Sequence, residues 1–258
     1  MATTIPLTAI EGAKRLAAFT AVDRHILSQH KVIGIGSGST VPYVVDRIVS
    51  QGLSVNKDRV FLATGFQSQQ LIVNAGLRLG DIDQFPVLDV TIDGADEVDP
   101  DLNCIKGGGA CHLREKVLAE GAKTFIVVAD YRKNSQVLGA NYAPGVPIEV
   151  APFAATSLLR SIKTLKTPPL NANLRMGTGK AGPVVTDNGN FVVDAVFGPE
   201  AMSDPVRVLH AVKLLTGVVE VGLFCNVAKA AYFGNQDGSV TVKLADGQVS
   251  QIEASSDA

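Results

Sequence analysis

The sequence contains no run of lysines or arginines, and its 23 basic and 25 acidic residues leave a formal net charge of −2. Nucleic acids and anionic membranes bind clustered positive charge, so neither class of partner receives electrostatic support. No apolar run approaches the ~18 residues that a membrane-spanning helix needs. The opening MATTIPLTAIEGAKRL has no long apolar core after a basic start and does not resemble a secretory signal. We therefore expect a cytoplasmic protein.

Cysteine is scarce, with Cys104, Cys111 and Cys225 as the full set. An odd number without metal-ligand spacing favours reduced, buried thiols, and we expect no metal site. Internal repeats and low-complexity segments are absent as well. What the sequence does have is 46% hydrophobic residues over 258 positions, enough for one large domain or two smaller ones.

In the first half of the chain, short apolar segments alternate with helical patterns of about ten residues or more. The expected helices are 8–28, 41–50, 67–75 and 110–121, and the expected strands are 32–35, 60–63, 87–92 and 124–129. Strands that alternate with helices form parallel sheets. This pattern predicts an α/β fold, a Rossmann-like parallel-sheet domain with helices on both faces.

After Asn141 the pattern changes. We expect a proline-punctuated strand within 144–152, a helix at 153–165, a hairpin at 183–197 around an Asp-Asn-Gly-Asn turn, a helix at 202–215 and a strand at 217–224. This order predicts a second, smaller α+β domain at 146–221, with 1–145 and 222–258 forming the catalytic domain. Within the returning segment, 231–244 reads as a hairpin turning at Asp237-Gly238, and the polar tail 248–258 is expected to fray.

The segment GIGSGST, Gly34 to Thr40, joins an expected strand to an expected helix. Glycines let the backbone approach a ligand, and the N–H groups and hydroxyls at a helix start form an anion site. A tight turn whose hydroxyls cap the helix is the alternative. The spacing excludes a dinucleotide fingerprint, because its third glycine would fall at Ser39 or Val41, and there is no Walker lysine.

An acidic segment, Asp93 to Glu97, follows the expected strand 87–92, at the edge where ligands bind in open α/β sheets. Crowding between Asp93 and Asp96 is expected to raise the pKa of one of them. Such a pair can bind sugar hydroxyls or move protons. A divalent-cation site lacks further oxygen ligands at regular spacing, and an acidic cap or turn remains the alternative.

Lys106 precedes three consecutive glycines, Gly107 to Gly109. Ordering three glycines is entropically costly, which indicates a close backbone approach, an oxyanion site or a hinge. On the expected helix that follows, Leu113, Val117 and Leu118 face the core, so helical periodicity alone places Glu115 at the surface. Lys14 and Lys133 read as surface lysines, and His25 and His112 as structural or surface residues.

In their order and spacing, GIGSGST, DGADEVD, KGGGACHLREK and VVADYRK resemble ribose-5-phosphate isomerases of the A type, in the eukaryotic-style branch. PIEVAP, AGPVVTDNGNF, GVVEVGLF and YFGNQDGSV extend the resemblance over nearly the whole chain. One departure is Cys111-His112, which stands where members of the family usually have small or hydroxylated residues. This departure affects the polarity of the pocket.

The resemblance implies roles that spacing does not. Glu115 corresponds to the general base, against the surface interpretation above, and Asp93 and Asp96 to the carboxylates that handle ring opening and sugar hydroxyls. Lys14 aligns loosely with a phosphate-contacting lysine. The implied catalytic residues are Glu115, Asp93, Asp96 and Lys106, and the implied substrate-binding residues are Ser37, Gly38, Ser39, Thr40, Asp93, Gly94, Ala95, Asp96, Lys106, Gly107, Gly108, Gly109 and Lys133.

The implied activity is the interconversion of D-ribose 5-phosphate and D-ribulose 5-phosphate by proton transfer through a cis-enediolate, in the pentose phosphate pathway. The family implies no cofactor and no metal, a sugar phosphate as the small-molecule partner, and a homodimer or homotetramer. A non-catalytic sugar-phosphate sensor on the same fold is the alternative, and it would not need Glu115. A nicotinamide dehydrogenase is disfavoured by the glycine spacing.

Overall fold

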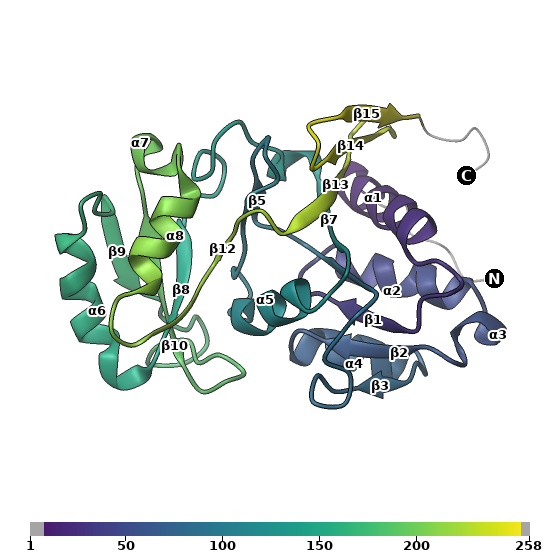
Figure 1. Cartoon of the computed structure of the whole chain (residues 1–258), viewed down its shortest axis with the longest axis horizontal. Coiled ribbons are helices and arrows are strands. Elements are labelled where there is room, and N and C mark those ends of the chain that lie inside the picture. Colours follow the sequence, from purple (N-terminus) through teal and green to yellow (C-terminus); the bar gives the residue numbers. More distant parts are fainter. Residues whose placement is uncertain (1–7, 254–258) are drawn as a thin grey trace.

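The computed structural model describes residues 8–253, and an eight-stranded sheet forms its larger part (Figure 1). The strands lie in the order β15-β14-β13-β7-β4-β1-β2-β3. All neighbours from β13 to β3 are parallel, and β14 and β15 extend the sheet antiparallel. Their bounds are β1 (Val32–Ile35), β2 (Val60–Ala63), β3 (Leu79–Gly80), β4 (Val90–Asp93), β7 (Phe125–Asp130), β13 (Ala228–Gly234), β14 (Val240–Leu244) and β15 (Val249–Ile252).

Helices cover both faces of this sheet, as the sequence predicts. On one face, side chains of α1 (Ala9–His25), α2 (Val41–Ser50) and α4 (Phe66–Asn74) pack against alternate strand residues such as Ile126 and Val128. The intervening Phe125 and Val127 face a second core, because successive strand side chains point to opposite faces. Helix α5 (His112–Glu120) and a three-stranded sheet of β5 (Glu97–Val98), β6 (Cys104–Ile105) and β12 (Leu223–Phe224) cover that side. A short α3 (Leu53–Asn56) follows α2.

A separate four-stranded antiparallel sheet lies to the left in Figure 1, in the order β11-β8-β10-β9. Its strands are β8 (Val146–Val150), β9 (Asn171–Leu174), β10 (Phe191–Val196) and β11 (Val218–Val221), and its helices are α6 (Ala155–Ser161), α7 (Pro199–Met202) and α8 (Pro205–Lys213). Their apolar side chains share one core, which is a small α+β architecture. The domain division at 146–221 stays a prediction.

The expected hairpin at 183–197 is wrong in its first strand. The turn forms, since the Thr186 N–H donates to the Asn190 carbonyl at 2.8 Å, but the antiparallel neighbours of β10 are β9 and β8, not the segment that precedes the turn. The chain reverses first between Gly177 and Gly182. As a result, the Arg175 N–H donates to the Val192 carbonyl, and the Val184 N–H donates to the Arg175 carbonyl on the side away from β10. A local turn signal fixes the reversal of the chain but not which segment fills the neighbouring place in the sheet.

Other boundaries differ from the sequence-based expectations. The strand at 217–224 breaks at Gly222 into β11 and β12, and the helix at 153–165 divides into η2 (Pro152–Ala154), α6 and η3 (Ile162–Thr164). The β13–β14 hairpin is confirmed. Fraying of the tail is wrong for Val249–Ile252, which pairs with β14. The described residues do not include 254–258 of that tail. They also exclude 1–7, the start of the segment in which we found no secretory signal.

No helix within 8–253 combines the length and the apolar character that crossing a membrane requires.

Candidate active site

The loop after β1 is drawn tightly onto the end of β4. The Gly36 N–H donates to the Ile92 carbonyl at 2.9 Å, and the Ser37 N–H donates to Asp93 Oδ1 at 2.9 Å. A Cβ atom on Gly36 would lie 1.9 Å from Asp93 Oδ1, so only glycine fits. Gly38 has a φ of +99°, and its N–H donates to Gln67 Oε1 at 2.8 Å. The loop is therefore fixed from two sides.

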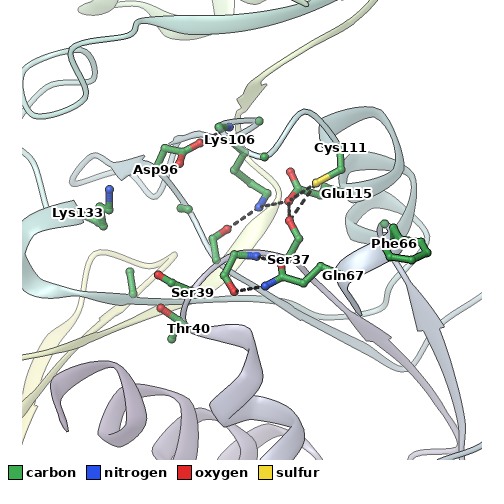
Figure 2. Close-up of a pocket in the computed structure, with 18 of the residues that line it drawn as sticks. Ser37, Ser39, Thr40, Phe66, Gln67, Asp96, Lys106, Cys111, Glu115 and Lys133 are labelled. Carbon is green, nitrogen blue, oxygen red and sulfur yellow. Dashed lines mark hydrogen bonds and ion pairs between the residues drawn. The ribbon is translucent and has the colours of Figure 1, made fainter. Parts of the chain in front are cut away.

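A cavity of about 310 Å³ opens at this edge of the sheet, where β1, β4 and β7 end (Figure 2). Almost all of the residues that the resemblance implies line it together. They are Ser37, Gly38, Ser39, Thr40, Gly94, Ala95, Asp96, Lys106, Gly107, Gly108, Gly109, Glu115 and Lys133. Asp93 is the exception, because it lies completely buried beneath the wall. Cys111, which the sequence analysis tied to the polarity of the pocket, lines it as well. The lining residues that sequence reasoning missed are Gly65, Phe66, Gln67, Ala129, Asp130 and Asp187.

Glu115 lies on α5 and is only 3% exposed, so the surface interpretation from periodicity is wrong. Its Oε1 atom accepts hydrogen bonds from Ser37 Oγ at 2.6 Å and from Cys111 Sγ at 3.4 Å, and it lies 3.4 Å from Lys106 Nζ. Its Oε2 atom has no hydrogen-bond partner among the described residues. One carboxylate oxygen is thus held by the protein, and the other is buried without a protein partner.

Asp93 and Lys106 form a buried ion pair, with 2.9 Å between Oδ2 and Nζ. Burial, together with repulsion from Glu115, raises the pKa of Asp93 to about 7 although Lys106 opposes the shift. Burial disfavours the charged ammonium, but attraction to Asp93 and Glu115 outweighs it and raises the pKa of Lys106. The Asp93–Asp96 crowding that we expected is replaced by crowding between Asp93 and Glu115.

Asp96 lines the cavity and accepts a hydrogen bond from the glycine loop. The Gly108 N–H donates to Asp96 Oδ2 at 2.8 Å, and burial raises the pKa of this carboxyl group. A Cβ atom on Gly108 would lie 2.6 Å from Asp96 Oδ1, and Gly107 has a φ of +108°. The loop therefore needs glycine for two reasons: one residue must approach a carboxylate closely, and another has a left-handed backbone.

The lining side chains separate into two groups (Figure 2). Ser39, Thr40 and Lys133 lie on one side of the view, and Ser37, Cys111 and Glu115 lie on the other. Lys133 belongs to η1 (Tyr131–Lys133), which follows directly after β7. Lys14 is not among the lining residues, and its Nζ is paired with Glu11 Oε1 at 2.7 Å.

The Cys111-His112 departure enters the cavity through the cysteine. Cys111 Sγ lies 3.0 Å from Ser37 Oγ, and burial raises the pKa of the thiol. His112 is completely buried and lies behind Gly107, outside the lining, while His25 bonds the Tyr232 hydroxyl at 2.8 Å. Among residues 8–253, no cluster of three or more His, Cys, Asp or Glu side chains is arranged to hold a metal ion.

Comparisons with known proteins point in one direction. Residues 60–238 match the family model of ribose 5-phosphate isomerase A (phosphoriboisomerase A). The chain is 64% identical to a ribose-5-phosphate isomerase of Cryptococcus neoformans, over 97% of this chain and 86% of that protein. The chain is also 56% identical to a ribose-5-phosphate isomerase of Schizosaccharomyces pombe, over 97% of this chain and 89% of that protein.

Solved structures agree in fold. A D-ribose-5-phosphate isomerase in complex with phospho-erythronic acid superposes with a TM-score of 0.81 at 35% identity, over 95% of this chain and 99% of that one. Ribose 5-phosphate isomerase from Plasmodium falciparum superposes with a TM-score of 0.78 at 30% identity, over 95% of this chain and 99% of that one.

Proposed function

The chain belongs to the ribose 5-phosphate isomerase A family and interconverts ribose 5-phosphate and ribulose 5-phosphate, and on that premise we propose that Glu115 is the base that moves the proton. The observation that carries this proposal is the free Oε2 atom of a buried carboxylate whose Oε1 atom is already bound by Ser37. The reading as a non-catalytic sensor finds no support, because the close relatives are named isomerases.

Interconversion of an aldose and a ketose moves one proton between C2 and C1 of the open-chain sugar. In the aldose, Glu115 Oε2 removes the proton from C2, which leaves a cis-enediolate with its charge on O1. The proton then returns to C1 while the hydroxyl proton of O2 passes to O1, and the ketone forms at C2. A single carboxylate on one face of the enediolate performs both transfers at carbon. A positioned base of this kind contributes roughly 10²–10⁴-fold to the rate.

The negative charge that develops on the enediolate oxygens needs fixed donors. The Lys106 ammonium group and the backbone N–H groups of Gly107 and Gly109 are the candidates, since these residues line the same cavity as Glu115, whereas the Gly108 N–H already donates to Asp96. Asp93 holds the ammonium from below, because its Oδ2 atom lies 2.9 Å from Nζ. Preorganised donors in a buried site stabilise developing charge more strongly than water does.

Ring opening requires a group that exchanges protons with the sugar oxygens. Asp96 lines the cavity, and burial raises the pKa of its carboxyl group, which favours the protonated form that can donate to a sugar oxygen. We assign ring opening and contacts with sugar hydroxyls to Asp96, with Asp93 as the buried partner of Lys106.

The phosphate group belongs on the side of the cavity away from Glu115. The hydroxyls of Ser39 and Thr40, just before α2, and the Lys133 ammonium group supply donors and positive charge there. With the phosphate anchored, C1 and C2 of the open-chain sugar extend toward Glu115, which gives the orientation that the proton transfer needs.

Glu115→Gln tests the base directly. The variant is expected to lose turnover by at least about 10²-fold and to lose exchange of the C2 proton of ribose 5-phosphate in deuterated water, while it still binds inorganic phosphate. The exposed Glu120 lies on the same helix, so Glu120→Gln is the matched control and should retain full activity. Full turnover by Glu115→Gln would contradict the assignment.

The finer partner and location assignments are also proposals. A homodimer or homotetramer is supported by large apolar side chains exposed in the second sheet's region, Phe153 at 103%, Leu214 at 86% and Leu170 at 76%. A cytoplasmic location is supported by three cysteines that are free within the described residues. Sedimentation analysis of the wild type and of Phe153→Ser tests the assembly, and the variant is expected to dissociate. An oligomer that is unchanged in the variant would show that the interface does not include Phe153.

A further inference from the structure

Arg175 connects the four-stranded sheet to the glycine loop, Gly107 to Gly109, which lies between β6 and α5. It follows β9 directly, and its Nη1 group donates to the carbonyls of Gly107 and Gly108 at 2.9 and 3.0 Å. The rest of the guanidinium group is held by Asp194 of β10, with Nε donating to Oδ2 at 2.8 Å and Nη2 donating to Oδ1. The side chain is only 15% exposed. None of the motifs in the sequence drew attention to it.

The two carbonyls that Arg175 binds determine where two N–H groups point. In a planar trans peptide the C=O of one residue points opposite to the N–H of the next. When the Gly107 carbonyl points to Arg175, the Gly108 N–H points the other way, and it donates to Asp96 Oδ2 at 2.8 Å. When the Gly108 carbonyl points to Arg175, the same rule turns the Gly109 N–H away from it.

The Gly109 N–H has no hydrogen-bond partner within 8–253, and Gly109 lines the cavity. A free amide donor in the wall of a sugar-phosphate site is suited to a developing oxyanion. Three consecutive glycines do not hold such a donor in place unaided, because glycine has the greatest backbone freedom of any residue. Something outside the loop has to fix these peptide planes.

We propose that Arg175, anchored by Asp194, is a positioning residue for the isomerisation: it orients two peptide planes so that the Gly108 N–H holds Asp96 and the Gly109 N–H faces the enediolate oxygen. This inference rests on the proposed function of the site. The second sheet thereby contributes to catalysis through the orientation of the loop, without touching the sugar.

Arginine is the side chain that this arrangement requires. Its planar fork carries five donors, which here serve two carbonyls and both oxygens of one carboxylate. Lysine carries three donors on a single nitrogen and does not span the same set of acceptors. Asp194 is itself fixed in a strand, paired with Asn173 of β9 on one side and Pro147 of β8 on the other. The anchor is therefore part of a rigid sheet.

The test compares Arg175→Met and Arg175→Lys with Arg47→Met in the full-length protein. Arg47 is the matched control, because it makes a bidentate pair with Asp23 (Nε–Oδ1 2.7 Å, Nη2–Oδ2 2.9 Å) between α2 and α1. We expect Arg175→Met to lower kcat on the order of 10²-fold, the effect of losing one oxyanion donor. KM should change by less than about threefold, because the phosphate contacts remain. The kcat of Arg175→Lys should lie between those of Arg175→Met and the wild type, and the kcat of Arg47→Met should match the wild type.

Two competitive ligands separate positioning from a general structural role. Phospho-erythronic acid carries a planar anionic carboxylate beside its hydroxyl-bearing carbons, so we expect Arg175→Met to weaken its inhibition at least about tenfold. Inhibition by inorganic phosphate should stay unchanged. Equal loss of both ligands would assign Arg175 to general stability and overturn the proposal, and so would a kcat within threefold of the wild type.

Arg175→Lys and Asp194→Asn keep the experiment decisive if Arg175→Met does not fold, since each retains most of the local packing. Both should show the loss of kcat and of phospho-erythronic acid binding with phosphate binding intact, and wild-type values in both would overturn the proposal. Failure here leaves wild-type turnover and the Glu115→Gln result untouched, so it is distinguishable from failure of the proposed function.

Discussion

Ser37 and Glu115, 78 residues apart in the sequence, are joined by a hydrogen bond of 2.6 Å between Oγ and Oε1. The serine belongs to the loop after β1 and the glutamate to α5, so the contact connects the two faces of the large sheet across its carboxyl edge. Cys111 Sγ reaches the same Oε1 atom, at 3.4 Å. Both donors bind Oε1 and leave Oε2 without a protein partner, which is why we propose Oε2 as the base.

Ser37→Ala removes the shorter of these two bonds. We expect kcat to fall about tenfold, in line with a hydrogen bond to a charged group of about 1.5 kcal/mol, with a smaller change in KM. Cys111→Ser, which keeps a donor at the same place, should retain kcat within about threefold. Steady-state kinetics check both, with the exposed Ser28→Ala as control. A Ser37→Ala enzyme as fast as the wild type would show that Oε1 needs no donor from the loop.

Asp93 makes stability depend on pH. Its pKa is raised from 3.8 to about 7 in the folded protein, so between these values the folded state binds more protons than the unfolded state. Stability contributed by Asp93 is therefore fully present below pH 3.8 and is lost as the pH rises through about 7. Asn cannot titrate. The unfolding free energy of the wild type minus that of Asp93→Asn should fall as the pH is raised from 4 to 7.5.

Urea unfolding of both proteins across this range measures that difference. Subtracting the unfolding free energy of the variant removes the contributions of other groups that titrate in the same pH window. Asp96 is one of these groups, because burial raises its pKa as well. A difference that stays constant, or that grows with pH, would mean that Asp93 is ionised throughout and that Lys106 neutralises its charge fully.

Gly36 and Gly12 give opposite predictions for the same substitution. Gly36→Ala places a Cβ atom 1.9 Å from Asp93 Oδ1 and 2.5 Å from its Cα, so backbone has to move, and we expect a loss of about 1–3 kcal/mol together with most of the activity. Gly12 lies in α1 with nothing within 4 Å of such an atom. Gly12→Ala should stabilise the protein by about 0.5–1 kcal/mol at unchanged activity. Thermal unfolding and kinetics check both, and an active Gly36→Ala enzyme would refute the tight loop–strand contact.

Sequence alone was enough to predict the alternation of strands and helices that forms much of the large sheet, the two glycine-rich loops and the motifs that identify the family, but not the order of the strands in that sheet. These features are local: apolar segments alternate with helical patterns, and DGADE and KGGG follow strands β4 and β6 at fixed spacing. Local chemistry is sufficient because strand, turn and helix signals act over a few residues.

The burial of Glu115, the pairing of β10 with β9 and the contact of Arg175 with the glycine loop depend on the folded chain as a whole. Of the three residues that periodicity placed in the core, Leu118 is buried, but Leu113 is only half-buried and Val117 is 42% exposed. The side of α5 that faces the sheet is that of Leu118 and Ala119. Glu115 and Lys116 are buried as well, and Lys116 bonds Glu220 of β11, so elements distant in sequence cover the remaining sides of the helix. The phase of a residue on its own helix is encoded locally, whereas what packs against the other faces depends on the rest of the chain.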